Sequence, residues 1–444
     1  MATPRINETR PLVADRHGRD NLPPASPSPA TQLSARNHGL DNLRAFLTTL
    51  VILHHTAIVY GGAGGWKLRS RCFPPESVML ITFNAIDQTF FMALFFFMSG
   101  HFTRIQMSKK RALRSAVIRS RLLRILLPAM VYTMLVEPTL NIMVWAWDKG
   151  ASDGAFADVW SIYLSYWTHV RGIRGPVWYL ALVMIFDMIA VLFLWSGEDP
   201  SQEVWRNILS QGKPFWAPVA WVMTILSSFA VRLVYPVGKV WAPLSLQLAY
   251  LPQYVLAYFG GHFSAVSDDL FVLIPFQYDT RNALRKLFLS LMLSLLSLGL
   301  LTVMEEKMMG IDVERVIQLT RGGLNIPALV YAAWNEMGFA LIGFALVAAF
   351  LQYGDFPWTC GNLWLPRYSY GAFLLHPPVS LGIELALESF MGCQAGDRRS
   401  HRHGFWPLFG PMLMTLVVGL VNILASWTAA WSLLSTVPLV SRII

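Results

Sequence analysis

The sequence predicts an all-α membrane protein, a polytopic bundle of about ten transmembrane helices. Hydrophobic residues make up 55% of the 444 residues and charged residues only 14%, and the mean hydropathy is +0.46, far from the balance of an average soluble domain. Apolar segments that can cross a bilayer about 30 Å thick recur along the chain. They span roughly residues 41–60, 79–103, 122–147, 176–196, 215–234, 247–264, 284–303, 326–351, 367–390 and 407–432.

The first 39 residues differ from the rest of the chain. Residues 1–39 contain six prolines, scattered arginines and few large apolar side chains, so they cannot bury enough surface to fold and we expect a disordered tail. Residues 40–444 then form the transmembrane domain. The connections between the apolar segments are too short to be separate domains, so any chemistry must lie in the helical bundle or at its mouths.

Charge sets the expected orientation in the membrane. Eight basic residues and no acidic residue lie between Arg104 and Arg124, which predicts that this connection faces the cytosol. Ten spans then place both termini, and the tail, in the cytosol. Much of the net charge of +9 lies beside membrane segments, which indicates contact with membrane lipid rather than with nucleic acid. We expect an integral, multi-pass protein of the plasma membrane or of an endomembrane.

The first apolar segment carries two ionisable residues eleven positions apart, Arg44 and His55. At about 100° per residue, eleven steps return to within roughly 20° of the starting direction, so both side chains share one helix face. The rise of about 1.5 Å per residue places His55 roughly 16 Å deeper, near the bilayer centre, where ionisable groups are usually functional. A neutral imidazole there can act as a base. A simple hydrogen bond between helices is the alternative, and His54 points away from this face, which favours a packing role.

An arginine-rich cytosolic mouth is the second candidate feature. Arg121 and Arg124, spaced i and i+3, share one face at the start of the third apolar segment. The planar guanidinium offers two parallel donors to an oxyanion, so these residues and Arg44 could hold a phosphate-bearing donor. Basic residues at a cytosolic interface also occur without any ligand. Asp41 lies one turn before Arg44, and we expect it to pair with and orient that guanidinium.

A late apolar segment carries a second deep histidine, His376. It lies roughly 13 Å into its segment, at a depth similar to that of the first histidine. Pro377 and Pro378 follow it and disturb the helix, and irregular backbone at this depth needs protein or water partners. Structural and functional roles for His376 are equally open. Further along, Glu384 and Glu388 fall toward the far interface. They could contact an acceptor there, although we interpret them as interfacial charges.

Cysteine usage and motif content argue against several other classes of site. Cys72, Cys360 and Cys393 are too few for a disulfide framework and show no metal-ligand spacing. The sequence contains no Gly-rich phosphate loop, no HExxH zinc helix and no nucleophile elbow. We therefore expect neither a metal nor a permanently bound cofactor.

Six segments, in a fixed order, carry a resemblance to a known family. They read LDNLRAFLTTLVILHH (40–55), FFMALFFFMSGHF (90–102), RLLRILLPAMVYTMLVEP (121–138), GPVWYLALVMIFD (175–187), LQLAYLPQYVLAYFGG (246–261) and SYGAFLLHPPV (369–379). Together they resemble the acyltransferase 3 family of multi-pass membrane acyltransferases, and within it the branch similar to glucan biosynthesis protein C. The resemblance covers most of the chain after the tail.

The resemblance implies transfer of an acyl group, often acetyl, from cytosolic acyl-CoA as co-substrate to a hydroxyl of a carbohydrate or another small molecule. The family pattern of an arginine, ten residues and a catalytic histidine corresponds to Arg44 and His55. Its basic RxxR element, associated with the acyl-CoA donor, corresponds to Arg121 and Arg124. A third element, the SY…H stretch of a late helix, corresponds to three supporting residues: Ser369, Tyr370 and His376.

Two questions stay open at the level of sequence. A proton-coupled exporter of a glycan or metabolite would also suit ten helices with deep histidines, although no inverted repeat of broken helices supports it. A catalytically silent scaffold is disfavoured by the intact set of basic residues and histidine. In an acyltransferase, His55 either accepts the proton of the acceptor hydroxyl or carries the acyl group covalently.

Overall fold

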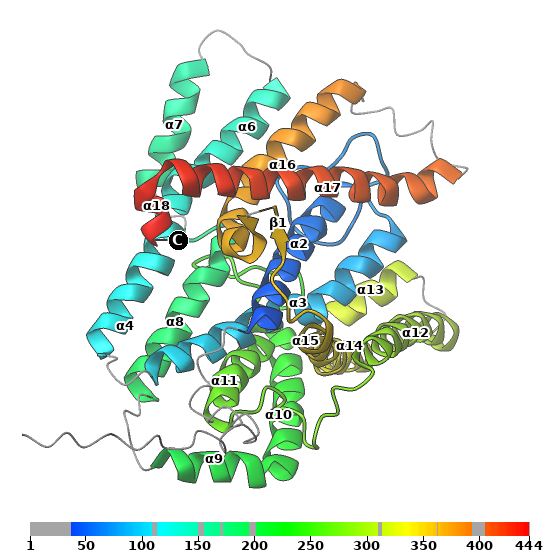
Figure 1. The fold of residues 1–444 in the computed structure, drawn as a ribbon. Coiled ribbons are helices and arrows are strands. Elements are labelled where there is room, and N and C mark those ends of the chain that lie inside the picture. The colour runs from blue at the N-terminus through cyan, green and yellow to red at the C-terminus, as the bar shows by residue number, and fades with distance from the viewer. Residues whose placement is uncertain are drawn as a thin grey trace, which may run out of the picture. The chain divides into compact units, whose positions relative to one another are not determined.

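A computed structural model describes residues 37–108, 113–149, 155–168, 172–194, 201–309, 313–361, 363–392 and 405–443. Helices dominate these residues and confirm the predicted all-α fold (Figure 1). Strands β1 (Thr359–Cys360) and β2 (Leu363–Trp364) form a short antiparallel hairpin in which Thr359 lies opposite Trp364. The predicted tail lies outside the described residues up to residue 36, and the first described helix begins at His38.

The helices follow one another with few breaks. The first half of the chain contains α2 (His38–Val59), α3 (Val78–Met107), α4 (Arg114–Arg121), η1 (Leu122–Leu126), α5 (Leu127–Val131), η2 (Tyr132–Val136), α6 (Glu137–Lys149), α7 (Ala155–Thr168), η3 (Gly175–Val177), α8 (Trp178–Phe193), α9 (Ser201–Gln211) and α10 (Lys213–Val234). The second half contains η4 (Leu248–Tyr250), α11 (Leu251–Ser267), α12 (Ala283–Met309), α13 (Val313–Arg321), α14 (Ile326–Gly338), η5 (Phe339–Gly343), α15 (Phe344–Tyr353), η6 (Leu365–Tyr368), α16 (Ser369–Met391), α17 (Phe405–Thr436) and α18 (Pro438–Ile443).

Each predicted span coincides with a helix or with a continuous run of helical turns. Eight helices of the described chain are long and apolar enough to cross a membrane, so the protein is an integral, multi-pass membrane protein. The two other predicted spans are α11, which has 17 residues, and α16. Buried polar residues on α16, including His376, reduce its apolar content. The third span, α4 through α6, runs without a break from Arg114 to Asp148.

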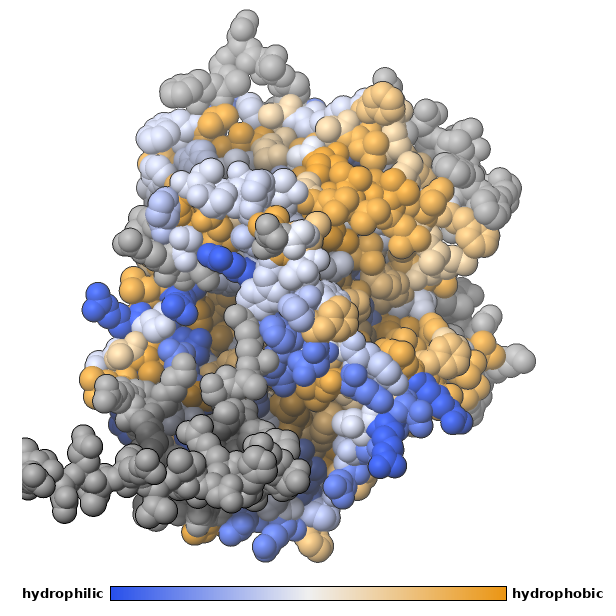
Figure 2. Space-filling model, viewed as in Figure 1, coloured by the Kyte–Doolittle hydropathy of each residue, from blue (hydrophilic) through white to orange (hydrophobic). Residues whose placement is uncertain are grey.

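Some helices present their apolar side chains outward. Only 11% of the apolar stretch of α12 and 39% of that of α17 are buried. Figure 2 shows a hydrophobic surface over the first part of α17, where exposed apolar side chains recur from Phe409 to Leu424. Because water would disfavour so large an apolar surface, these helices are suited to contact with lipid.

The centre of the bundle is formed by the close pair α3 and α11. A Cβ atom at Gly100 of α3 would lie 1.9 Å from the Tyr258 carbonyl oxygen, and one at Gly261 of α11 would lie 1.8 Å from the Phe97 carbonyl oxygen. Only glycine permits this approach, because both opposing atoms belong to backbone. The backbones of the two helices therefore pack directly against each other, and α2 packs against α3.

The two ends of the bundle differ in the oxidation state of their cysteines. At the start of α2, the Asn42 amide donates to the carbonyls of Gly354 (2.7 Å) and Phe356 (2.6 Å), so the loop containing free Cys360 lies at this end. The segment from Gly61 to Ser77 follows the opposite end of α2, and its Cys72 is disulfide-bonded. Disulfides persist in oxidising compartments. This bridge, which a count of three cysteines did not suggest, supports the predicted orientation with the start of α2 on the cytosolic side.

Interior prolines leave backbone carbonyls without their usual partner, because proline has no N–H to donate to the residue four positions earlier. In three places a side chain donates to the carbonyl that proline leaves open. Pro128 leaves the Arg124 carbonyl open, and the Tyr370 hydroxyl donates to it at 2.8 Å. Pro138 leaves the Met134 carbonyl open, and the Trp167 indole donates to it at 3.2 Å. Pro377 leaves the Phe373 carbonyl open, and His376 Nδ1 donates to it at 2.6 Å.

Candidate active site

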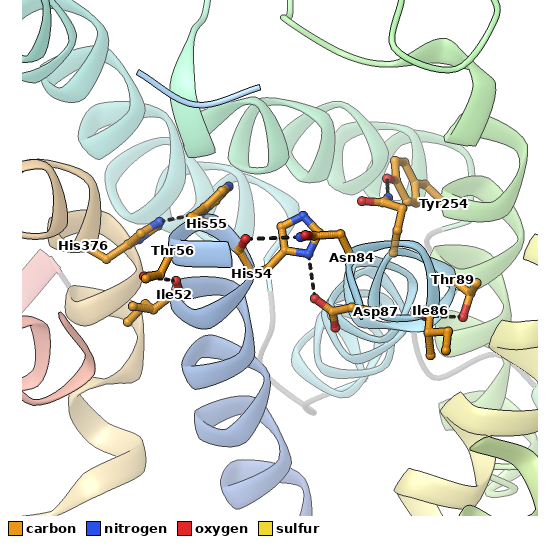
Figure 3. A network of polar contacts seen from close by, with 11 residues as sticks. Ile52, His54, His55, Thr56, Asn84, Ile86, Asp87, Thr89, Tyr254 and His376 are labelled. Atoms are coloured by element: carbon orange, nitrogen blue, oxygen red, sulfur yellow. Dashed lines mark hydrogen bonds and ion pairs between the residues drawn. The ribbon is translucent and has the colours of Figure 1, made fainter. Parts of the chain in front are cut away.

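Two histidines from helices far apart in sequence meet inside the bundle. His55 Nδ1 on α2 and His376 Nε2 on α16 are 3.0 Å apart, and their rings are nearly parallel. Figure 3 shows the two rings directed toward one another, with His54 on the other side of α2. His376 and His54 are buried, whereas His55 keeps some accessible surface. The structure thus brings together the two deep histidines predicted from sequence and leaves one of them reachable.

Pro377 and Pro378 do not break the helix as expected, because α16 continues through them from Ser369 to Met391. The Phe373 carbonyl that Pro377 leaves open determines how the histidine pair is protonated. The Phe373 carbonyl can only accept, so His376 Nδ1 must carry the proton that it donates there. In a neutral His376 ring, Nε2 is then an acceptor. It receives the Nδ1 proton of His55.

The consequence for His55 is a defined tautomer. With its proton on Nδ1, the neutral ring exposes an unprotonated Nε2. That lone pair is what a general base or a nucleophile requires. A histidine oriented by a hydrogen bond to its other ring nitrogen is the arrangement found in catalytic triads, here with a second imidazole in place of a carboxylate.

The ring of His55 is covered by Trp66, a residue that the sequence analysis did not single out. The indole lies parallel to the imidazole, with centroids 4.4 Å apart and an interplanar angle of 17°. Trp66 Nε1 donates to Glu384 Oε2 at 2.9 Å. No sequence signal marks this residue, because it belongs to a loop whose path depends on tertiary contacts.

His54 has partners of its own on α3. Its Nδ1 lies 2.7 Å from Asp87 Oδ2, and its carbonyl accepts from the Asn84 amide at 3.2 Å (Figure 3). Its ring stacks on Phe91. The expected packing role is consistent with these contacts. Asp87, a carboxyl group within an apolar run, is a second residue that the sequence analysis missed.

The interpretation of Glu384 and Glu388 as interfacial charges was wrong. Both side chains are buried, at 0% and 2% exposure. Glu384 accepts from Trp66 and from the Asn422 amide (3.2 Å), and Glu388 accepts from the Ser70 hydroxyl at 2.5 Å. The far half of α16 lies inside the protein because α17 and the loop after α2 cover it.

The two arginines of the RxxR element have different surroundings. Arg121 Nε lies 3.1 Å from Asp187 Oδ2 of α8, and Arg121 Nη2 donates to Thr103 Oγ1 at 2.8 Å. Asp187 is fully buried and also accepts from the Tyr258 hydroxyl at 2.6 Å. The side chain of Arg124, in contrast, is exposed. Arg121 is therefore largely committed to an internal ion pair, whereas Arg124 faces outward.

Ser369 and Tyr370 make backbone contacts at the same end of the bundle. The Ser369 hydroxyl donates to the Pro366 carbonyl at 2.8 Å, at the start of α16. The Tyr370 hydroxyl donates to the Arg124 carbonyl, which Pro128 leaves open, and so joins α16 to the helix that carries the RxxR element. These contacts are structural.

Arg44 lies at the mouth, eleven residues before His55 on the 22-residue helix α2. Its Nη2 is 3.5 Å from Asp41 Oδ1, so the expected ion pair is present, and it also lies 3.5 Å from the Pro366 carbonyl oxygen. The Arg44 side chain is 37% exposed. The guanidinium therefore remains within reach of a solvent-borne ligand.

Comparison with known proteins identifies the family. The family described as an acyltransferase domain, acyltransferase 3, matches residues 37–431. The chain belongs to the acyltransferase 3 family. No curated protein and no solved structure matches it. The narrower resemblance to the glucan biosynthesis protein C branch stays a prediction.

Membership of the family makes this protein a membrane acyltransferase, and the matched region contains every residue of the candidate site. Within the described residues, no group of three or more His, Cys, Asp or Glu side chains is placed to hold a metal ion.

Proposed function

We propose that this acyltransferase transfers an acyl group, in the simplest case acetyl, from cytosolic acyl-CoA to a hydroxyl of a carbohydrate or small-molecule metabolite. The observation that carries the proposal is the His55–His376 contact of 3.0 Å, together with the His376–Phe373 bond that sets its direction. It supplies an unprotonated Nε2 in the interior of a membrane domain. Such a group can take the proton of a hydroxyl that would otherwise be a poor nucleophile.

The reaction balances without any further reactant. As the acceptor oxygen bonds to the acyl carbon, its proton moves to His55 Nε2 and the carbon–sulfur bond of the thioester breaks. The imidazolium then protonates the departing thiolate, which leaves as CoA. In the covalent variant, Nε2 attacks the acyl carbon first, the carbon–sulfur bond breaks and CoA departs as a thiolate. The acceptor oxygen then bonds to the acyl carbon, the carbon–nitrogen bond to the ring breaks, and the hydroxyl proton ends on the thiolate. Both routes use the same lone pair.

The donor is assigned to the arginine-rich mouth. The CoA phosphates would meet the exposed Arg124 and the partly exposed Arg44, because guanidinium groups bind phosphate oxygens in a bidentate manner. Arg121 supports this mouth through its ion pair with Asp187, which fixes the start of the third span. The thioester would then extend inward along the α2 face that carries both Arg44 and His55.

The test uses purified protein, radiolabelled acetyl-CoA and a metabolite extract as the source of acceptor. The wild-type protein should release CoA in step with the label entering a hydroxyl-bearing product, and His55→Ala should not. A transporter that uses its histidines as a proton relay would release no CoA. Rapid quenching in denaturant at neutral pH separates the two chemical routes, because only the covalent route leaves label on the protein. A fully active His55→Ala variant would refute the proposal.

A further inference from the structure

The loop after α2, residues 61–77, turns back toward the histidine pair. Gly61 (φ +118°) and Gly64 (φ +140°) adopt backbone conformations that other residues rarely reach. The Arg69 guanidinium donates to the carbonyls of Gly62 and Gly64, both at 2.8 Å. These bonds close the turn, and Trp66, two residues after Gly64, lies over His55.

Trp66 is held there by a chain of hydrogen bonds that returns to α2. The indole N–H donates to Glu384 Oε2, and Glu384 Oε1 accepts from the Asn422 amide. Asn422 also donates to the Thr56 hydroxyl at 2.9 Å, and Thr56 follows His55 in the sequence. The indole is therefore fixed to the same helix as the ring that it covers.

The rest of the loop is anchored on two other helices. Lys67 pairs with the buried Glu137 of α6. The Ser70 hydroxyl (2.5 Å) and the Arg71 amide (3.0 Å) donate to Glu388 of α16. Arg71 also pairs with Asp148 at 2.5 Å. The residues that follow Trp66 are therefore fixed to α6 and α16.

We propose that loop 61–77 covers the acyl-transfer site on its extracytosolic side, and that Trp66 is a positioning residue that keeps water on that side from reaching His55. The inference rests on the proposed function. If water reaches the thioester, its oxygen bonds to the acyl carbon, its proton passes to His55, and the carbon–sulfur bond breaks. The products are then a carboxylic acid and CoA. The cover thus decides whether the acyl group is transferred or hydrolysed, as closed active sites do in general.

The first experiment measures CoA release from acetyl-CoA without any acceptor. Trp66→Ala should raise this release about tenfold over wild type by admitting water, and combining it with His55→Ala should remove the increase. Trp66→Phe keeps a ring over His55 and should stay near wild type. Trp160→Ala, at an exposed position of α7, is the matched control. Release by folded Trp66→Ala that does not exceed wild type would overturn the inference.

The second experiment does not depend on catalysis. In a Cys360→Ser background, the His55→Cys variant is labelled with a soluble maleimide, with and without Trp66→Ala. Opening the cover should increase the labelling rate about tenfold, since thiol reactivity follows exposure. The background without His55→Cys gives the baseline, and size-exclusion chromatography checks folding. An unchanged rate overturns the cover. Faster labelling in a protein that releases no CoA supports the cover and counts against the proposed function alone.

Discussion

The histidine cluster (His54, His55 and His376) and the arginine mouth (Arg44, Arg121 and Arg124) of this acyltransferase differ in how many of their polar groups have a partner within the protein. Around His55, every neighbouring imidazole and carboxylate has a protein partner: His376 bonds to Phe373, and His54 bonds to Asp87. At the mouth, Arg121 is paired internally but the Arg124 side chain is exposed. A preorganised interior suits chemistry, whereas an exposed cation suits the capture of a charged substrate.

The same comparison separates residues that sequence treats as equivalent. Arg121 and Arg124 belong to one RxxR element, but only Arg121 neutralises a buried carboxylate. His54 and His55 are adjacent, but only His55 contacts His376 of α16 and keeps accessible surface. Each pair therefore provides its own internal control.

The largest effect is expected at the reactive end of the histidine cluster. His55→Ala should lower the rate of acyl transfer by about 10²- to 10⁴-fold, the usual contribution of a general base. Binding of acyl-CoA should stay close to wild type, because the mouth is untouched. Steady-state kinetics and a direct binding measurement check both statements. His101→Ala, near the end of α3, is the control, and a comparable loss there would show that the effect is not specific.

The next effect concerns stability. Arg121→Ala leaves Asp187 buried without its cation, which should cost about 3–5 kcal/mol and lower the midpoint of thermal unfolding in detergent. Arg124→Ala should leave that midpoint unchanged because its side chain is exposed. Adding Asp187→Asn to Arg121→Ala should recover part of the loss. Equal midpoints for the two single arginine variants would contradict the distinction.

A smaller effect is expected on donor affinity. Arg124→Ala should raise the KM for acyl-CoA about tenfold with little change in kcat, since a charge-assisted contact to phosphate is lost. Arg124→Lys should recover part of the affinity through charge alone. Dephospho-CoA thioesters provide a second readout, because they should be less sensitive to the substitution. An unchanged KM would remove Arg124 from donor binding.

The smallest effect tests the protonation of the histidine pair. Pro377→Ala restores an N–H that competes with His376 for the Phe373 carbonyl, so the His55 tautomer should be less well defined. We expect kcat to fall about threefold to tenfold, with KM unchanged. Pro378→Ala is the matched control, because among the described residues no side chain donates to the Leu374 carbonyl that this proline leaves open. The same change in both variants would favour a general effect on the helix.

Much of the fold could be predicted because lipid imposes simple rules. All ten apolar segments correspond to helical regions, since every backbone group in a bilayer must be satisfied within a helix. Helical geometry also placed Arg44 and His55 on one face, and the depth of His376 matched that of His55. Their contact could not be derived, because depth along two helices says nothing about their distance across the bundle.

The missed residues share a physical cause. Trp66 lies on a loop, and its position depends on glycine conformations and on carboxylates hundreds of residues away. Glu384 and Glu388 were expected at the interface because the helical rise gives the depth of a residue in the membrane. It does not show which other elements cover the helix at that depth. Asp87 and Asp187 did leave a signal, since a carboxyl group inside an apolar span is expensive and usually has a purpose.

The carbonyls that prolines leave open have a consequence for how this chain tolerates change. Tyr370 and Pro128 lie far apart in sequence, but one creates the vacancy that the other fills. Replacing Tyr370 by phenylalanine should destabilise the protein on its own. It should have little effect on stability when residue 128 has an amide hydrogen. The effect of substituting such a remote donor should thus depend on whether its proline is present, so the two substitutions should be strongly epistatic.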